Sequence, residues 1–416
     1  MTSVPVADTM AVSQTVLASG QANTDTMISL TAILAVALLA PILSFMTGKR
    51  IPAVVFLIVL GVIIGPSVWG VAEIDSGISI LRQLGLGMLF LLAGYELDTD
   101  SLRSKEGGNA ALTWLMCLVL AFIGALVFLK GNGALTAVTL AIAVTSTALG
   151  TLLPILKQSD LLRTNVGKSV MLHGAVGELM PIMAIALLLS ARSMGVTFLI
   201  LLAFFAIAAM VAVVPRTVAT LVPWVGRAII DGSSATNQSI VRMVVLMLAI
   251  LMTVAAVFDL DVVLGAFAAG IVLRGLVPER AQGLIEERLD VMGYGFFIPV
   301  FFVCSGLNID VKTVGANIGQ LFAVVGVILV ARGLPVFLRE MFTATGSKLT
   351  TTKQKLQLAC YAATGLPIIV AVTEVATNAH LLEESAASLL VAGGAVTVLL
   401  FPLIAAALQP KDKRRL

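Results

Sequence analysis

A single carboxylic acid, Glu178, lies at the centre of a long apolar segment, in the sequence AVGELMP of residues 175–181. An ionised carboxylate in the middle of a bilayer is costly, so an acid at this place marks a functional site by default. A carboxyl group removed from water can exchange a proton near ambient pH. We interpret Glu178 as the centre of a proton-coupled ion site; the alternative is a protonated side chain that only ties helices together.

Hydroxyl and helix-breaking residues interrupt two other apolar segments. Residues 145–150 read TSTALG, with Pro154 beyond them, and residues 364–367 read TGLP. Backbone at such a break is tolerated in a membrane only where it faces protein or a water-filled cavity, and its free carbonyls suit an ion. For either segment alone, a kink that packs a neighbouring helix is the alternative. The predicted break residues are Gly150, Thr364, Gly365 and Pro367. The predicted oxygen ligands for Na⁺ or K⁺, besides Glu178, are the hydroxyl groups of Thr145, Ser146 and Thr147.

Three further side chains are candidates for supporting roles. Arg332 lies well inside an apolar segment. It is either a counter-charge for Glu178, a cap for half-helix ends, or a side chain that extends its charge to the membrane interface. His173 lies five residues before Glu178 and either relays protons or packs through a hydrogen bond. Glu374 lies near the outer end of its segment. It is either a gate residue on the proton path or a structural cap.

The composition excludes a soluble protein. Of the 416 residues, 59% are apolar and 12% are charged, whereas about a quarter are charged in an ordinary soluble domain. The net charge of +3 comes without a large block of like charge, so nucleic acid is not an expected partner. The three cysteines lie in apolar stretches without CxxC spacing, so neither disulfides nor a bound metal cofactor is expected. The expected partner is the lipid bilayer.

Apolar runs of about 20 residues, each long enough to cross a bilayer, predict an all-α membrane protein with about 13 transmembrane helices. The ninth and tenth runs are short. The thirteen predicted spans are 28–46, 52–69, 78–97, 110–130, 135–156, 166–190, 196–214, 239–257, 262–276, 292–307, 314–339, 356–376 and 386–408.

The positive charges predict the orientation, because cytoplasmic loops retain lysine and arginine. Of the 26 basic residues, 21 lie in one set of alternating loops, three in the other set and two within spans. This asymmetry places the N-terminus outside and the C-terminus inside. We expect residues 1–27 to be a disordered outer tail and residues 409–416 a cytoplasmic tail, without a soluble regulatory domain.

The two interrupted spans predict internal symmetry. Spans five and twelve are seven elements apart, so they cross the membrane in opposite directions. This is the parity of an inverted repeat, in which spans one to six correspond to spans eight to thirteen. We therefore expect spans five and twelve to be discontinuous helices in corresponding positions of the two halves.

Three sequence motifs resemble a known family. Residues 295–310 read GFFIPVFFVCSGLNID, residues 264–270 read LGAFAAG, and residues 84–98 read LGLGMLFLLAGYELD. These motifs resemble the Kef-type sodium/proton exchanger branch of the monovalent cation:proton antiporters, over residues 28–408. The resemblance implies a scaffold of residues 28–97 and 239–307, which usually forms a homodimer, and a mobile ion-transport core of residues 110–190 and 314–408.

The resemblance also implies that spans five and twelve are discontinuous helices that cross each other. In that family, span six carries the ion-binding acid and span eleven a basic residue, and Glu178 and Arg332 fall on these positions. Two departures stand out. Gly177 replaces an extra acid or amide that many relatives have, so ion choice and stoichiometry cannot be transferred. Kef proteins also carry a nucleotide-binding domain that this sequence lacks, which argues against nucleotide-gated potassium efflux.

The expected function is secondary active antiport of protons against Na⁺ or K⁺, electroneutral and by an elevator-like movement, in a bacterial inner membrane. A cation channel and a sodium-coupled organic-anion symporter are the alternatives. An intramembrane enzyme ranks last, because the sequence has no HExxH or GxSxG motif and no Asp-rich prenyl site.

Overall fold

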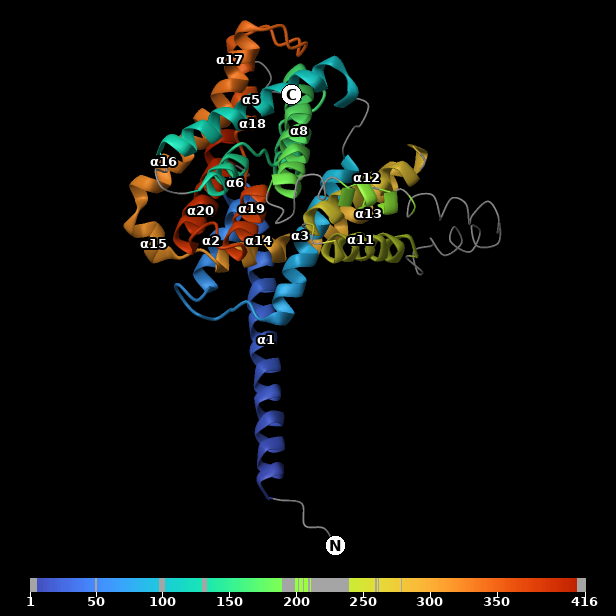
Figure 1. The fold of residues 1–416 in the computed structure, drawn as a ribbon, viewed down its shortest axis with the longest axis vertical. Coiled ribbons are helices and arrows are strands. Elements are labelled where there is room, and N and C mark those ends of the chain that lie inside the picture. The colour runs from blue at the N-terminus through green and yellow to red at the C-terminus, as the bar shows by residue number, and fades with distance from the viewer. Residues whose placement is uncertain are drawn as a thin grey trace, which may run out of the picture.

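The computed structural model is helical, as the sequence predicted, in the part of the chain that it describes. That part is residues 6–48, 51–96, 102–128, 133–188, 199–200, 202–204, 206–208, 210, 239–258, 260, 262–277 and 279–409. The contacts between helices divide most of them into two groups. The first group, in the lower part of the bundle in Figure 1, consists of α1 (Val6–Met46), α2 (Ala53–Ile64), α3 (Ser76–Glu96), α11 (Ser239–Val257), α12 (Val262–Leu276), α13 (Glu279–Met292), η1 (Gly293–Phe297) and α14 (Ile298–Leu307).

The second group lies above and beside the first in Figure 1. It consists of α5 (Lys105–Phe128), α6 (Ala134–Val144), α7 (Leu149–Gln158), α8 (Asn165–Leu188), α15 (Val311–Ala316), α16 (Ile318–Ile328), η2 (Leu329–Gly333), α17 (Leu334–Phe342), α18 (Thr352–Ala362), α19 (Pro367–Asn378) and α20 (Glu384–Ala407). The assignment of the first group as a scaffold and of the second as a mobile core stays a prediction.

In the described part of the chain, nine helices are long and apolar enough to cross a membrane. The predicted second and ninth spans form the shorter apolar helices Ala53–Ile64 and Val262–Leu276. A helix of 12 residues, such as α2, is roughly 18 Å long, which is less than the hydrocarbon thickness of about 30 Å. The predicted seventh span lies mostly outside the described residues. The total of thirteen spans and the orientation therefore stay predictions.

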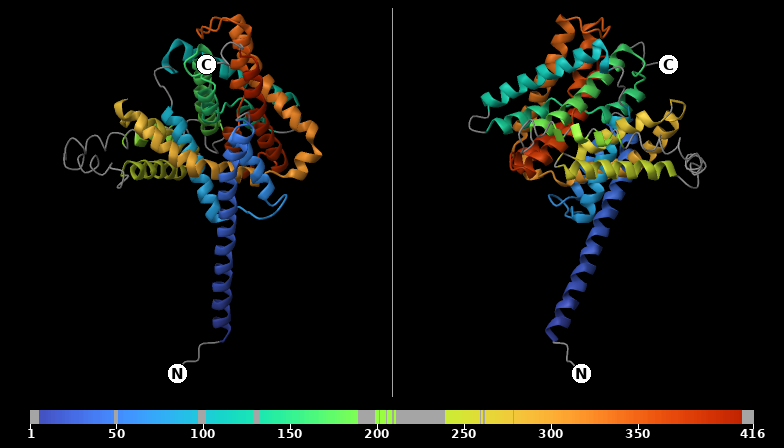
Figure 2. Two further views of the ribbon diagram at one scale, coloured as in Figure 1. Left: turned by 180° about the vertical axis from the view of Figure 1, so that it is seen from behind. Right: turned by 45° about the vertical axis from the view of Figure 1, so that its right-hand side comes forward.

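The structure has residues 6–27, which the sequence analysis assigned to a disordered outer tail, in α1. This helix has 41 residues, and its N-terminal half projects from the bundle (Figures 1 and 2). The sequence contains no proline between Pro5 and Pro41. Adding turns to an existing helix costs much less than starting one, so the apolar part of α1 extends through the polar residues before it.

Glycines bring the backbones of α3 and α12 together. A Cβ atom at Gly94 would overlap the carbonyl oxygen of Phe267, and one at Gly270 would overlap that of Leu91. Small residues at facing positions allow such close approach between membrane helices. The LGAFAAG and LLAGYE sequences therefore form one tightly packed helix pair.

Prolines widen two helical turns. Pro299 follows the π-helical turn η1, and Pro335 follows η2. A proline has no N–H for the carbonyl four residues before it, and a wider turn relieves the resulting mismatch. The two π turns carry Tyr294 and Arg332, both of which contact the region around Glu178.

Candidate functional site

Two discontinuous helices cross at the centre of the second group, as the sequence predicted. The first chain path is interrupted between α6 and α7, from Thr145 to Ala148. The second is interrupted between α18 and α19, from Ala363 to Leu366. Thr364 and Gly365 therefore lie in a break, whereas Gly150 and Pro367 lie in the first turns of the half-helices that follow.

Hydrogen bonds join the two breaks directly. The N–H of Ala148 donates to the carbonyl of Thr364 at 2.7 Å, and the Thr147 hydroxyl donates to the carbonyl of Ala362 at 2.6 Å. The first break thereby supplies donors to two carbonyls at the second break that would otherwise lack a helical partner. A Cβ at Gly365 would lie 2.7 Å from the carbonyl oxygen of Ser146, so this crossing requires a residue without a side chain.

Glu178 lies beside this crossing, on α8, and is 3% exposed. Its Oε1 accepts a hydrogen bond from the N–H of Gly150 at 3.2 Å, in the first turn of α7. The free N–H groups at a helix N-terminus carry partial positive charge, which stabilises an anion. The Oε2 atom has no hydrogen-bond partner among the described residues. One carboxylate oxygen is thus held by the broken helix, and the other is free to bind a proton or a cation.

Arg332 is fully buried, so the alternative in which its charge extends to the interface is wrong for this structure. Its Nε donates to the Thr147 hydroxyl at 3.1 Å, and its Nη2 donates to the carbonyl of His173 at 3.0 Å. Its Nη1 lies 3.8 Å from Cys117 Sγ. The guanidinium therefore caps the break, which is one of the roles predicted for it. It forms no ion pair with the Glu178 carboxylate among the described residues.

Gly177 makes room for these contacts. A Cβ at this position would overlap the Thr147 hydroxyl and would lie 2.9 Å from Arg332 Nη2. The carbonyl of Gly177 also accepts the N–H of Thr147 at 3.0 Å. The place where relatives often have a second polar side chain is therefore filled here by Arg332 and Thr147.

The hydroxyl groups of the first break donate to backbone carbonyls. Thr145 bonds to the carbonyl of Ala141 at 2.7 Å, and Ser146 bonds to that of Ala143 at 2.8 Å. The same two carbonyls also accept the backbone N–H groups of Thr145 and Ser146, so the hydroxyl bonds add to the backbone bonds at the end of α6. Each oxygen keeps lone pairs for a cation, so ligation by Thr145, Ser146 and Thr147 stays a prediction.

His173 is buried, and its Nδ1 has no partner within the described residues. Its backbone carbonyl, rather than its ring, takes part in the site, through Arg332. A proton relay through His173 therefore stays a prediction.

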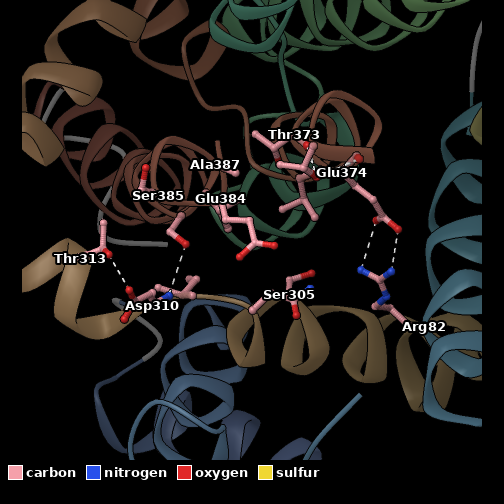
Figure 3. A pocket seen from close by; sticks show the side chains of 15 residues that line it. Arg82, Ser305, Asp310, Thr313, Thr373, Glu374, Glu384, Ser385 and Ala387 are labelled. Atoms are coloured by element: carbon pink, nitrogen blue, oxygen red, sulfur yellow. Dashed lines mark hydrogen bonds and ion pairs between the residues drawn. The ribbon is translucent and has the colours of Figure 1, made fainter. Parts of the chain in front are cut away.

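Glu374 forms an ion pair that the sequence analysis missed. Its carboxylate accepts two hydrogen bonds from Arg82, at 2.6 and 3.2 Å (Figure 3). Arg82 belongs to α3 and Glu374 to α19, so the pair joins the two groups of helices. The signal was present in the sequence, because Arg82 and Glu374 are both charged residues inside predicted apolar segments.

Two cavities lie on opposite sides of the crossing. One, of about 470 Å³, contains the Arg82–Glu374 pair and lies where α14 ends and α20 begins (Figure 3). The other, of about 730 Å³ and mostly apolar, lies where α1 and α20 end, and it reaches Gly150 and Tyr294. The second cavity thus extends to the residue whose N–H binds Glu178, and we call it the α7 cavity.

Tyr294 is another site residue that the sequence analysis missed. Its hydroxyl donates to the carbonyl of Gly150 at 3.1 Å, from η1 in the first group to α7 in the second. Tyr294 directly precedes the GFFIPVFF sequence of residues 295–302 and is one of three tyrosines in the chain. This position is the signal by which the sequence could have identified it.

Comparison with known proteins gives consistent results. The family described as sodium/hydrogen exchanger, transmembrane, matches residues 34–408. YjbQ of Bacillus subtilis (strain 168), provisionally assigned as a Na⁺/H⁺ antiporter, is 24% identical over 93% of this chain and 64% of its own length. The Na⁺/H⁺-K⁺ antiporter GerN of Bacillus cereus is 22% identical over 65% of this chain and 69% of its own. The chain thus spans about two thirds of the length of these curated relatives, whose names are those of transporters.

The fold also resembles a solved structure. The sodium proton antiporter MjNhaP1 from Methanocaldococcus jannaschii, at pH 8, superimposes with a TM-score of 0.62 at 19% sequence identity. The match covers 92% of this chain and 97% of that chain. The chain therefore shares the fold of that protein.

Proposed function

Because the chain belongs to the sodium/hydrogen exchanger family, we propose that it exchanges protons for a monovalent cation, Na⁺ or K⁺, across a membrane. The observation that carries this proposal is Glu178. It is a buried carboxylate on α8 beside the N-terminus of the half-helix α7. One of its oxygens accepts the N–H of Gly150, and the other has no partner among the described residues. This arrangement can hold a proton or a metal cation at the same atom, but not both.

Exchange follows from that competition. Protonated Glu178 is neutral and leaves a cation without its charged ligand. Ionised Glu178 is balanced by the α7 N-terminus and attracts a hard monovalent cation, for which oxygen ligands are preferred. Hydroxyl and carbonyl oxygens of residues 145–147 and of the second break complete the proposed shell. Each occupant must leave before the other binds, which couples the two fluxes.

Transport further requires that Glu178 face each side in turn. We propose an elevator-like movement, in which the second group of helices carries the site past the first group. Two features support it: the helix contacts fall into two groups, and cavities approach their interface from opposite sides. Rigid-body movement of one helix group around a site at the membrane midplane is how many transporters with inverted repeats alternate access.

Several finer assignments belong to this proposal. They are an electroneutral cycle, a place in the Kef-type branch, a homodimer formed through the first group, and a bacterial cytoplasmic membrane with the N-terminus outside. The exchanger would then contribute to pH homeostasis. We also keep Glu374 and His173 as candidates for the proton path.

Proton flux in proteoliposomes tests the proposal. A pH-sensitive dye inside the vesicles should report proton movement when Na⁺, K⁺ or Li⁺ is added outside. Glu178→Gln should abolish this exchange, because the amide keeps the volume of the side chain but cannot release a proton. Glu340→Gln is the matched control: Glu340 is also buried, on α17, and accepts a hydrogen bond from Ser347 that an amide oxygen can also accept.

Three results would contradict the proposal. Wild-type rates in folded Glu178→Gln would remove the carboxylate from the mechanism. Cation flux without proton movement would favour the channel, and cation flux that needs an organic anion would favour the symporter.

A further inference from the structure

Pro154 leaves one carbonyl of α7 without its usual partner. In an α-helix the carbonyl of Gly150 would accept the N–H of residue 154, and residue 154 is a proline, which has no N–H. The Tyr294 hydroxyl fills this place, at 3.1 Å. A side chain from the first group of helices thus supplies a hydrogen bond that the second group cannot make for itself.

Gly150 also holds Glu178. Its N–H donates to Glu178 Oε1 at 3.2 Å, while its carbonyl accepts from Tyr294. Both groups belong to the first turn of α7, next to the break. The position of this turn therefore sets the position of the donor for Glu178, and Tyr294 fixes the turn against the first group.

We propose that Tyr294 is a positioning residue of the exchanger, which holds α7 and Glu178 in the orientation that faces the α7 cavity. This inference rests on the proposed function. Tyr294 and Gly150 both line that cavity, so the bond forms where the cavity meets the site. If the second group moves relative to the first, α7 leaves Tyr294, and Pro154 prevents α7 from replacing the lost bond internally.

The bond consequently favours one orientation over the other. A typical hydrogen bond of this kind changes an equilibrium constant about fivefold. The apparent affinity for a cation on each side scales with the fraction of molecules that face that side. The ratio of the KM for Na⁺ on the α7-cavity side to the KM on the opposite side therefore follows the equilibrium between the two orientations.

The test is to measure both KM values for Na⁺ in proteoliposomes with one protein orientation. In Tyr294→Phe we expect the KM ratio to rise about fivefold, because fewer molecules face the α7 cavity. Tyr361→Phe is the matched control, because Tyr361 is buried and its hydroxyl has no hydrogen-bond partner among the described residues. Its KM ratio should equal that of the wild type.

A second variant tests the reason for the effect. In a Pro154→Ala background, residue 154 again has an N–H for the Gly150 carbonyl, so adding Tyr294→Phe should change the KM ratio less than about twofold. An unchanged ratio in Tyr294→Phe, an equal rise of both KM values, or the same change with and without Pro154 would overturn the inference. A wild-type protein without cation/proton exchange would overturn the proposed function as well, whereas an active one with an unchanged ratio would leave that function standing.

Discussion

Arg332 binds together three elements around the helix crossing. From η2 it reaches the Thr147 hydroxyl in the first break and the carbonyl of His173 on α8. A buried guanidinium is expensive unless its N–H groups are satisfied. Here a side-chain oxygen and a backbone carbonyl satisfy it at the place where helical hydrogen bonds are missing. Its charge lies close to the site without a direct bond to Glu178.

We predict that Arg332→Ala lowers both stability and exchange. Losing two hydrogen bonds from a charged donor, with their acceptors left buried, should reduce the free energy of unfolding by roughly 3 kcal/mol. The break that orients Gly150 loosens, so exchange should fall about tenfold or more. Thermal unfolding in detergent and dye-based proton flux measure the two effects.

Lysine substitutions provide the control for the Arg332 prediction. Arg332→Lys should recover part of the stability only, because one ammonium group cannot reproduce the planar fork that reaches Thr147 and His173 together. Arg274→Lys, in the first group, should leave exchange near the wild-type rate. An unchanged melting temperature together with an unchanged pH profile in Arg332→Ala would contradict the role assigned to the guanidinium.

For individual residues, the sequence identified the side chains of the candidate site but not all of their contacts. Glu178 and Arg332 were predictable, because charge inside an apolar segment is rare and costly. The sequence left open whether Arg332 is a counter-charge for Glu178 or a cap of the break. Their partners depend on which faces of α8 and η2 meet the break, and the spacing of residues along one helix does not contain that information.

At the scale of elements, prolines determine where helical hydrogen bonds are lost. Pro367 begins α19 after the second break, and Pro299 and Pro335 follow the two π turns. Each missing N–H frees a carbonyl for another partner. Such breaks were predictable because glycine and proline are unusual at the centre of an apolar run. The short lengths of α2 and α12, and the extension of α1, were not predictable from hydropathy alone, since hydropathy does not fix helix ends.

Asp75 lies directly before the first residue of α3, outside the predicted spans, and its contacts predict a contribution to the stability of the fold. Its carboxylate accepts the N–H of Ile78 at 2.8 Å and the hydroxyl of Thr26 on α1. The Thr26 hydrogen bond, followed by the Ile78 bond, holds the pKa of Asp75 below its ordinary value. We expect Asp75→Ala to lower the free energy of unfolding by about 1 kcal/mol at pH 7, through the lost helix cap.

The pH dependence of this effect has a definite sign. Because the pKa of Asp75 is lowered by folding, its stabilisation is present above the unfolded pKa of about 3.9 and disappears as the pH falls through the folded pKa. The difference in melting temperature between the wild type and Asp75→Ala should therefore shrink in acid. Asp75→Asn keeps an acceptor oxygen and should lose less stability at pH 7. A difference that grows in acid would contradict the assigned role.

For the whole molecule, the Arg82–Glu374 pair tests whether the two helix groups move. The pair links α3 to α19 across their interface, so an elevator-like movement must separate these side chains. We predict that a short, reducible thiol cross-linker between Arg82→Cys and Glu374→Cys stops the exchange that this double variant shows before cross-linking, and that reduction returns exchange to that rate. The native cysteines Cys117, Cys304 and Cys360 are buried and should react slowly.

The control for this cross-link lies within one group. Arg339 on α17 donates to the Thr113 hydroxyl on α5 at 3.1 Å, and both helices belong to the second group. Cross-linked Arg339→Cys/Thr113→Cys should therefore continue to exchange. Undiminished transport by the cross-linked Arg82→Cys/Glu374→Cys protein would rule out relative movement of α3 and α19.

The charge carried per cycle follows from the groups available at the helix crossing. Glu178 is the carboxylate there, and Gly177 stands where a second acid would lie, its space filled by Thr147 and Arg332. Among the other candidates, Glu374 is paired with Arg82 at the interface, and an arginine is not expected to lose its proton. One proton should thus be exchanged for one monovalent cation, which makes the cycle electroneutral.

An imposed membrane potential distinguishes the two stoichiometries. Moving one net charge across 100 mV is worth about 2.3 kcal/mol, so an electrogenic cycle would respond strongly to voltage. We predict that Na⁺-driven proton flux in proteoliposomes does not change when a potassium diffusion potential is imposed with valinomycin. If the protein also transports K⁺, an impermeant-anion gradient can set the potential instead. Rates that follow the voltage, or a measurable current, would mean that a second group carries a proton and that a single carboxylate does not account for transport.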